Sequence, residues 1–397
     1  MKCLFCCLSG TWGRSSLRVI HYWGWVSWWE PGVIPITPGS FLCIKSSIGY
    51  TIAMSHEVLY RKYRPQTFAD VIGQEHIVSA LEGAISSHAI GHAYLFCGSR
   101  GIGKTSIARI FARSIGTSDN DTYEIDAASN RGIDDVRALR EAVLTLPFES
   151  RYKVYIIDEV HMLTKEAFNA LLKTLEEPPK HVVFILATTE MDKLPETIIS
   201  RCQTFSFRRP TADILKDVIT TVAKKEGLTL APDAAELIAL LGDGSFRDAH
   251  GTLEKVMSGA KSKKISREDV ERVTGSPRAE IVRKFIEALA KRDAEGALSA
   301  VVELKKHSSD PKLFLDLVTA RARLILLTRI APAIAKSHLA DIAVEDKEFI
   351  EKMAKDTDNA VGATFLRSIL STYDIVGATP ISELPLELLV AEVTQQK

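Results

Sequence analysis

Apolar residues in the N-terminal half of the chain form short continuous runs separated by longer mixed stretches. Ala93–Cys97, Val154–Ile157 and Val182–Ala187 consist of apolar and aromatic residues throughout. Such runs predict strands buried on both faces, as in a parallel sheet. Tyr123–Ile125 and Thr204–Phe207 predict two shorter strands.

The stretches between these runs repeat their apolar residues at every third or fourth position, which predicts helices packed on one face. The predicted helices are Ile77–Ser87, Ser106–Arg113, Ile133–Leu146 and Lys165–Glu176. Pro178 and Pro179 end the last of them. Strands that alternate with helices predict an α/β fold with a parallel sheet covered by helices.

After Pro210 we expect helices and no further strand. The first helices there are Ala212–Glu226, Pro232–Leu241, Phe246–Ser258 and Ser266–Val273. A linker at 275–277 then precedes helices such as Ala279–Ala290 and Leu313–Ile330. We therefore expect an α/β domain at 54–210, a small helical domain at 211–275 and a second helical domain at 276–397.

Residues 1–53 differ from the rest. They contain all five tryptophans and four of the six cysteines, and they keep neither a helical nor a strand period. The segment lacks the long apolar core and cleavage site of a signal peptide and the helical apolar face of a membrane-surface anchor. It also offers no scaffold for an aromatic ligand site. We interpret the segment as a translated leader from a misassigned start, with the natural chain beginning at Met54.

Composition indicates an ordinary globular protein. The 397 residues include 25% charged and 46% hydrophobic residues, and 50 basic residues balance 50 acidic ones. No run of about 18 apolar residues predicts a membrane span. Only Cys97 and Cys202 lie in the main body, which excludes a disulfide framework and suits a reducing cytoplasm. Cys3 and Cys6 have no second pair of ligands and predict no metal site.

One glycine-rich octet follows the Ala93–Cys97 run and fits the phosphate-binding pattern G-x-x-x-x-G-K-[ST]. Its residues are Gly98, Ser99, Arg100, Gly101, Ile102, Gly103, Lys104 and Thr105, with Ser106 next. Backbone N–H groups of such a loop surround phosphate at a helix N-terminus. We expect Lys104 to reach the β- and γ-phosphates and Thr105 to bind Mg²⁺.

Asp158 and Glu159 end the Lys153–Ile157 run, where ligands bind in parallel sheets. Asp158 is a candidate ligand of Mg²⁺, and Glu159 is a candidate base for the attacking water. The alternative interpretation is structural: the two acids would be the N-cap and a first-turn residue of a helix. The upstream phosphate loop favours the first interpretation and predicts nucleotide hydrolysis.

Five strings then indicate a family. They are Leu59–Gln74, Glu124–Asn130, Asp158–Pro179, Ser200–Cys202 and Gly244–Ala249. Together they closely resemble the bacterial DNA polymerase III gamma/tau family, the ATPases of the sliding-clamp loader within the AAA+ superfamily. The resemblance is strong over residues 56–275 and weaker to the C-terminus. It implies an AAA+ domain, a helical lid and a helical oligomerisation collar.

The resemblance implies roles for matching positions. Arg201 would be an arginine finger for a neighbouring subunit, Arg247 the second sensor and Thr189, at the end of the Val182–Thr189 strand, the first sensor. Arg64 and Pro65 with Ile72 and Gly73 would form the adenine and ribose edge. An isolated arginine is usually a solvated side chain, but these motifs favour the functional interpretation. The implied cofactors are ATP and Mg²⁺.

The implied function is ATP-driven loading of the clamp onto primer-template DNA in the cytoplasm. The chain would be the motor ATPase of a pentameric hetero-oligomer within the DNA-directed DNA polymerase holoenzyme, without a membrane partner. One alternative is an ATP-binding assembly subunit, similar to replication factor C, with little turnover. A more distant one is a branch-migration motor. Intact Lys104, Asp158, Glu159 and Arg201 favour the motor.

The sequence departs from the family between the phosphate-loop helix and the next strand. The family usually carries a four-cysteine zinc module there, whereas this chain has only Ile115–Thr122 and no cysteine. We therefore predict no zinc. We also expect the polymerase-binding and helicase-binding tail of the long family form to be absent.

Overall fold

The computed structural model of the chain describes residues 57–130, 132–260, 262–307, 309–339, 342, 344–356 and 359–395. The expected leader at 1–53, the expected start at Met54 and the four cysteines before Cys97 lie outside these residues. All described residues belong to one unit of the chain, His56–Lys397.

A five-stranded sheet organises the first part of the described chain, and every neighbouring pair of strands is parallel. The strand order is β2-β3-β4-β1-β5. The bounds are β1 Ala93–Cys97, β2 Thr122–Asp126, β3 Lys153–Asp158, β4 Val182–Thr188 and β5 Gln203–Ser206. All five predicted strands are confirmed, and the apolar runs form the central strands because helices cover both faces.

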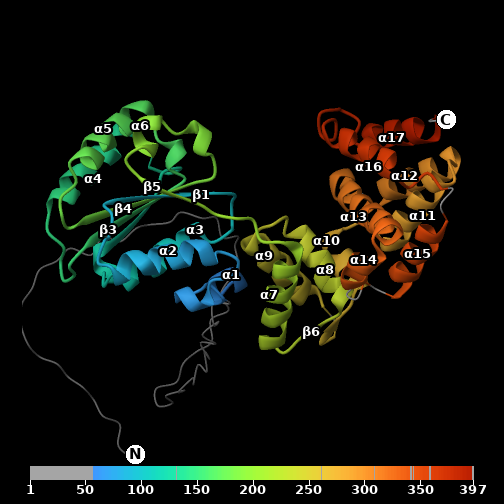
Figure 1. The fold of residues 1–397 in the computed structure, drawn as a ribbon, viewed down its shortest axis with the longest axis horizontal. Coiled ribbons are helices and arrows are strands. Elements are labelled where there is room, and N and C mark those ends of the chain that lie inside the picture. The colour runs from blue at the N-terminus through green and yellow to red at the C-terminus, as the bar shows by residue number, and fades with distance from the viewer. Residues whose placement is uncertain are drawn as a thin grey trace, which may run out of the picture. The chain divides into compact units, whose positions relative to one another are not determined.

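Helices pack on both faces of this sheet (Figure 1). Their bounds are α2 Glu75–Ser86, α3 Lys104–Ser114, α4 Ile133–Leu144, α5 Lys165–Glu176 and α6 Glu196–Ile199. The short helix α1 Leu59–Lys62 packs instead with the helices that follow the sheet. Alternate strand residues face opposite sides, so Tyr94 packs with α2 and α3 while Leu95 packs with α4 and α5. This three-layer arrangement confirms the predicted α/β class.

Four helices follow the sheet, as predicted. They are α7 Ala212–Lys225, α8 Pro232–Leu241, α9 Phe246–Gly259 and α10 Arg267–Thr274. The expectation that strands cease after Pro210 is wrong, because β6 Thr229–Leu230 and β7 Lys264–Ile265 form a parallel pair. Two-residue strands are too short to show a hydrophobic period, so the pattern could not reveal them.

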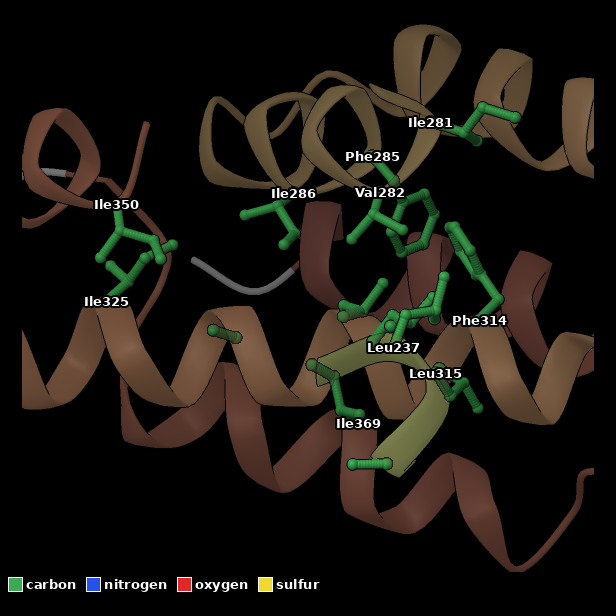
Figure 2. Packing of buried hydrophobic residues seen from close by; sticks show 14 of the residues in the cluster. Leu237, Ile281, Val282, Phe285, Ile286, Phe314, Leu315, Ile325, Ile350 and Ile369 are labelled. Atoms are coloured by element: carbon green, nitrogen blue, oxygen red, sulfur yellow. The ribbon is translucent and has the colours of Figure 1, made fainter. Parts of the chain in front are cut away.

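The rest of the chain is helical, as predicted. The helices are α11 Ala279–Ala290, α12 Ala294–Lys306, α13 Pro311–Ile330, α14 Pro332–Leu339, α15 Val344–Lys355, α16 Ala363–Tyr373 and α17 Leu384–Gln395. Figure 2 shows their buried side chains meeting Leu237 of α8. The rings of Phe285 and Phe314 lie edge to face, 5.1 Å apart. Helices on both sides of residues 275–277 therefore share one hydrophobic core.

The short connection between α3 and β2 is closed by a buried carboxylate. Asp121 is fully buried, and it accepts backbone N–H bonds from Phe148 at 2.6 Å, Glu149 at 3.0 Å and Ser150 at 2.9 Å. Burial acts to raise the pKa of Asp121, but these donors outweigh it and lower the pKa to about 2. One side chain thus ties this connection to the segment before β3.

None of the helices in the described ranges is both long and apolar enough to cross a lipid bilayer.

Candidate nucleotide-binding site

The glycine-rich octet links the carboxyl end of β1 to the start of α3, as its motif predicts. Gly98 and Gly101 have φ of +148° and +74°, conformations that other residues adopt at a cost. A side chain on Gly101 would also collide with Ser245, the residue that caps α9. The Gly101 carbonyl accepts a 3.0 Å bond from Phe246 N–H. The loop therefore needs glycine both for its curvature and for contact with α9.

Lys104 begins α3 and turns back into the loop. Its Nζ donates to the carbonyls of Gly98 at 2.7 Å and Ser99 at 2.9 Å. Burial lowers the pKa of Lys104, whereas the charges of Glu159 and Asp158 act to raise it. The arrangement holds a cation at the centre of the loop, where it can bind an anion.

Two acidic residues face the loop from the end of β3. Thr105 Oγ1 donates a 2.8 Å hydrogen bond to Oδ2 of Asp158. Glu159 follows in a left-handed conformation with φ of +48°. Its Oε2 accepts from the backbone N of Thr189 at 3.2 Å and from the Thr189 hydroxyl at 3.0 Å. The strand β4 ends at Thr188 rather than at the expected Thr189, which leads out of it toward Glu159.

A cavity of about 970 Å³ joins these groups to the segment around α1 and to α9. The predicted residues that line it are Arg64, Pro65, Ile72, Arg100, Gly101, Ile102, Gly103, Lys104, Thr105, Ser106, Asp158, Glu159 and Arg247. The predicted residues outside this lining are Gly73, Gly98, Ser99, Thr189 and Arg201. Ligand pockets commonly measure about 300–1,000 Å³, so a nucleoside triphosphate fits.

Arginines supply much of the charge in this cavity. Arg64 Nε donates to Ser106 Oγ at 2.9 Å. Burial lowers the pKa of Arg64, and repulsion from Arg109 lowers it further. The Arg247 guanidinium lies 5.7 Å from the centre of the Tyr60 ring. Together with Lys104, these cations suit a polyanionic ligand, and the two carboxylates suit its metal.

Thr105 and Asp158 are the pair that could hold Mg²⁺, since Mg²⁺ is usually bound by one or two protein oxygens together with phosphate and water. Across the described ranges, no group of three or more His, Cys, Asp or Glu side chains could hold a metal ion. Cys97 and Cys202 are free thiols. Burial raises the pKa of Cys202 to about 12, so it remains protonated.

Arg201 lies apart from the cavity lining, between α6 and β5. Its Nη2 atom forms a 2.7 Å ion pair with Glu176, and its Nη1 atom donates to the carbonyl of Thr197 at 2.8 Å. The side chain is 34% exposed. The guanidinium is thus held outside this chain's own site.

Sequence reasoning missed several residues at the site. Tyr60, Phe246 and His250 line the cavity. His161 contacts Glu159 but is not part of the cavity lining. All but His250 lie within the strings that indicated the family, but no local pattern assigned them a role. Their positions depend on contacts with residues far away in the sequence.

Comparisons with known proteins agree with these motifs. The DNA polymerase III subunit tau of Bacillus subtilis (strain 168) is 41% identical over 302 residues, 71% of this chain and 54% of that protein. The tau subunit of Escherichia coli (strain K12) is 37% identical over 74% of this chain and 49% of its own length. This chain spans about half the length of these relatives. The family described as "DNA polymerase III, delta subunit" matches residues 118–211.

Two solved structures are also similar. The Thermotoga maritima RuvB Holliday junction branch migration motor has a TM-score of 0.47 and 24% identity, covering 57% of this chain and 79% of its own. The Bacillus subtilis DNA clamp loader delta protein has a TM-score of 0.31 and 17% identity, covering 80% of this chain and 99% of its own.

Proposed function

The chain belongs to the family of bacterial DNA polymerase III gamma/tau subunits, and we propose that it is the ATP-hydrolysing motor subunit of a sliding-clamp loader. The proposed reaction converts ATP and water to ADP and phosphate, and its energy drives the loading of a clamp onto primed DNA. The names of the relatives, which are subunits of a DNA polymerase, support the replicative role.

One observation carries the ATPase proposal: four groups with complementary roles meet at the carboxyl ends of β1 and β3. Lys104 supplies positive charge for the β- and γ-phosphates, while Thr105 and Asp158 offer oxygens to a metal. Bound Mg²⁺ would neutralise charge on the phosphates. Glu159 would accept a proton from the attacking water, and Thr189 would orient its carboxylate.

The remaining cavity residues are assigned to the nucleotide. Arg64 and Pro65 with Ile72 and Gly73 would border the adenine and ribose. The position of Arg64, Pro65 and Ile72 in the cavity lining supports this assignment. Arg247 would reach the γ-phosphate from α9. We assign 54–210 to the AAA+ domain, 211–275 to the lid and 276–397 to the oligomerisation collar.

Arg201 is assigned to the site of a neighbouring subunit. It is outside the cavity lining of its own chain and partly exposed, as a finger acting between subunits must be. A rigid guanidinium suits the charge that develops on a transferred phosphoryl group. This role requires an assembly, and we propose a pentamer with other clamp-loader subunits, in the cytoplasm.

The test is an ATPase assay of the full chain, alone and with the cognate clamp-loader subunits, clamp and primed DNA. A clamp loader should hydrolyse ATP faster when clamp and primed DNA are both present. ATP binding without turnover in every mixture would instead identify an assembly subunit. Turnover that DNA stimulates equally well without the clamp would favour a DNA motor such as a branch-migration protein.

A further inference from the structure

His161 lies between two carboxylates immediately behind the candidate site. Its Nδ1 atom is 3.4 Å from Oε2 of Glu159 and 3.0 Å from Oγ1 of Thr188. Its Nε2 atom is 3.4 Å from Oε1 of Glu190. The side chain is only 6% exposed and is not part of the cavity lining. It therefore approaches Glu159 from the protein side and not from the ligand side.

The groups around Nδ1 indicate which ring nitrogen donates. Thr188 Oγ1 donates to the carbonyl of Glu190 at 3.2 Å and accepts from the N–H of Glu190 at 3.0 Å. A hydroxyl has a single proton, and when that proton is directed at the Glu190 carbonyl the Thr188 oxygen accepts from His161. This arrangement favours a proton on Nδ1 of His161, which faces Thr188 Oγ1 at 3.0 Å and the acceptor-only oxygen Oε2 of Glu159 at 3.4 Å.

Glu159 depends on its surroundings for its orientation. Its φ of +48° is unfavourable for a residue with a side chain and persists only where neighbouring groups hold it. Thr189 donates twice to Oε2, and Nδ1 of His161 faces the same oxygen. These contacts restrict rotation of the carboxylate, while Oε1 takes no part in them.

The other side of the ring faces Glu190, which is ion-paired with a lysine. Glu190 forms a 2.7 Å ion pair with Lys193, and the Lys193 hydrogen bond lowers the pKa of Glu190. Glu190 therefore stays charged, and its Oε1 atom lies beside Nε2. The contact of Nδ1 with Thr188 and the burial of the side chain restrict rotation of the imidazole plane.

We propose that His161 is a positioning residue of the ATPase: its Nδ1–H, held in place by Thr188, keeps Glu159 in the direction needed for proton abstraction. This inference rests on the proposed role of Glu159 as the base. It predicts that His161 affects turnover rather than ATP binding, since the ring lies outside the cavity lining.

Three variants of the full chain test this, each assayed for ATP affinity by calorimetry and for turnover with clamp-loader subunits, clamp and primed DNA. His161→Asn keeps an amide near the Nδ1 position and should retain turnover within about threefold. His161→Gln keeps an amide only near the Nε2 position. His161→Gln and His161→Ala should lower kcat by about 10–100-fold, because misplacing a reacting group by about 1 Å costs this much. All three should bind ATP as the unmodified chain does.

His181 provides the matched control. It is a half-buried histidine of the same domain whose Nε2 atom lies 3.1 Å from the carbonyl oxygen of Thr145, and His181→Ala should leave turnover unchanged. Combining His161→Ala with Glu159→Gln should cause no loss beyond Glu159→Gln alone, because both act through one group. Thermal unfolding of each variant distinguishes misfolding from loss of positioning.

The outcomes separate the two proposals. If Glu159→Gln hydrolyses ATP normally, the assignment of the base fails. If Glu159→Gln is inactive while His161→Ala is fully active, only the positioning role fails. Rescue by His161→Gln but not by His161→Asn would overturn the assignment to Nδ1, and a loss of ATP affinity equal to the loss of turnover would indicate a structural role.

Discussion

The hydroxyl of Thr105 and the carboxylate of Asp158 are joined by a 2.8 Å hydrogen bond, although they lie 53 positions apart in the sequence. Thr105 is at the start of α3 and Asp158 is at the end of β3. Parallel pairing through β4 brings the carboxyl ends of β1 and β3 to the same edge of the sheet. Two oxygens are thus preorganised for a cation beside the phosphate loop.

This pair predicts how the proposed ATPase activity depends on magnesium. Thr105→Ala should raise the Mg²⁺ concentration needed for half-maximal turnover, because one of the two oxygens is lost. Thr105→Ser keeps the hydroxyl and serves as the control, with a Mg²⁺ dependence close to that of the unmodified chain. Titration of Mg²⁺ at saturating ATP measures the effect, and identical curves for the two variants would contradict it.

Substitutions of Lys104 and Glu159 should impair different properties, ATP binding and turnover respectively. Lys104→Ala should abolish measurable ATP binding, since the buried ammonium at the centre of the loop is lost. Glu159→Gln should keep ATP affinity but lower turnover by about 10²–10⁴-fold, as expected for a missing general base. Calorimetric titration with ATP and phosphate release measure the two properties separately. Near-normal hydrolysis by Glu159→Gln would remove Glu159 from the mechanism.

Local patterns predicted the parts of the site that lie in continuous segments. The phosphate loop and the Asp158–Glu159 pair each combine a strand with the residues that follow it, so one window of sequence contains the signal. Asp121, which lies outside the site, shows why other features of the fold could not be predicted. Its partners Phe148 and Ser150 lie 27 and 29 positions away, and no period links them.

The same limit applies to the region after the sheet. Helices there carry a clear helical period, but β6 and β7 are two residues each and pair across more than thirty positions. The role of His161 also depends on Thr188, which is the last residue of a different strand, β4. Contacts of this kind come from the packing of elements, which single-sequence periodicity does not encode.

Asp121 predicts a loss of stability in acid. Its pKa of about 2 in the folded chain lies below the ordinary value of 3.8, so its contribution to folding is complete above about pH 4 and is lost as the pH falls toward 2. Asp121→Asn should lower the free energy of unfolding at neutral pH by about 1–3 kcal/mol, the cost of unsatisfied buried donors. The difference between the two proteins should shrink between about pH 4 and pH 2.

Asp119→Asn is the control for that measurement, since Asp119 is an exposed acid two positions earlier. Chemical unfolding of each protein across this pH range records the comparison. A constant stability difference between Asp121→Asn and the unmodified chain down to pH 2 would show that the carboxylate charge is not responsible.

Asp346 is predicted to be a critical buried charge among the C-terminal helices. It is 2% exposed and accepts from Arg283 at 2.6 Å and from Arg321 at 3.0 Å. Arg321 also forms two bonds with Glu236 of α8. Asp346→Ala should destabilise this region by up to about 3–5 kcal/mol, because the buried Arg321 keeps Glu236 but loses one of its two acid partners.

The adjacent residue Glu345 supplies the control. It is 81% exposed and lies 3.5 Å from Arg283, so Glu345→Ala should change stability by less than about 1 kcal/mol. Calorimetric unfolding distinguishes the two substitutions. Equal effects would mean that the buried network adds no more than a surface ion pair.

The final prediction concerns Arg201, which separates an intersubunit mechanism from a self-contained one. Arg201 lies outside its own cavity lining and is paired with Glu176. Arg201→Ala should therefore bind ATP normally as an isolated chain. The assembly should lose about 10³–10⁵-fold in turnover, the usual contribution of an arginine finger. Arg272→Ala is the control, because Arg272 is also a partly exposed arginine paired with an acid.

Mixing two inactive variants gives the decisive result. Lys104→Ala cannot bind ATP but still carries Arg201, whereas Arg201→Ala binds ATP but lacks the finger. Where Lys104→Ala sits beside Arg201→Ala in the right order, one composite site is complete, so the mixed assembly should regain turnover that neither variant has alone. An arginine acting in its own subunit gives no such recovery, since every chain in the mixture lacks one essential group. Failure of complementation in assemblies proven to contain both variants would therefore place Arg201 in a structural or intrasubunit role.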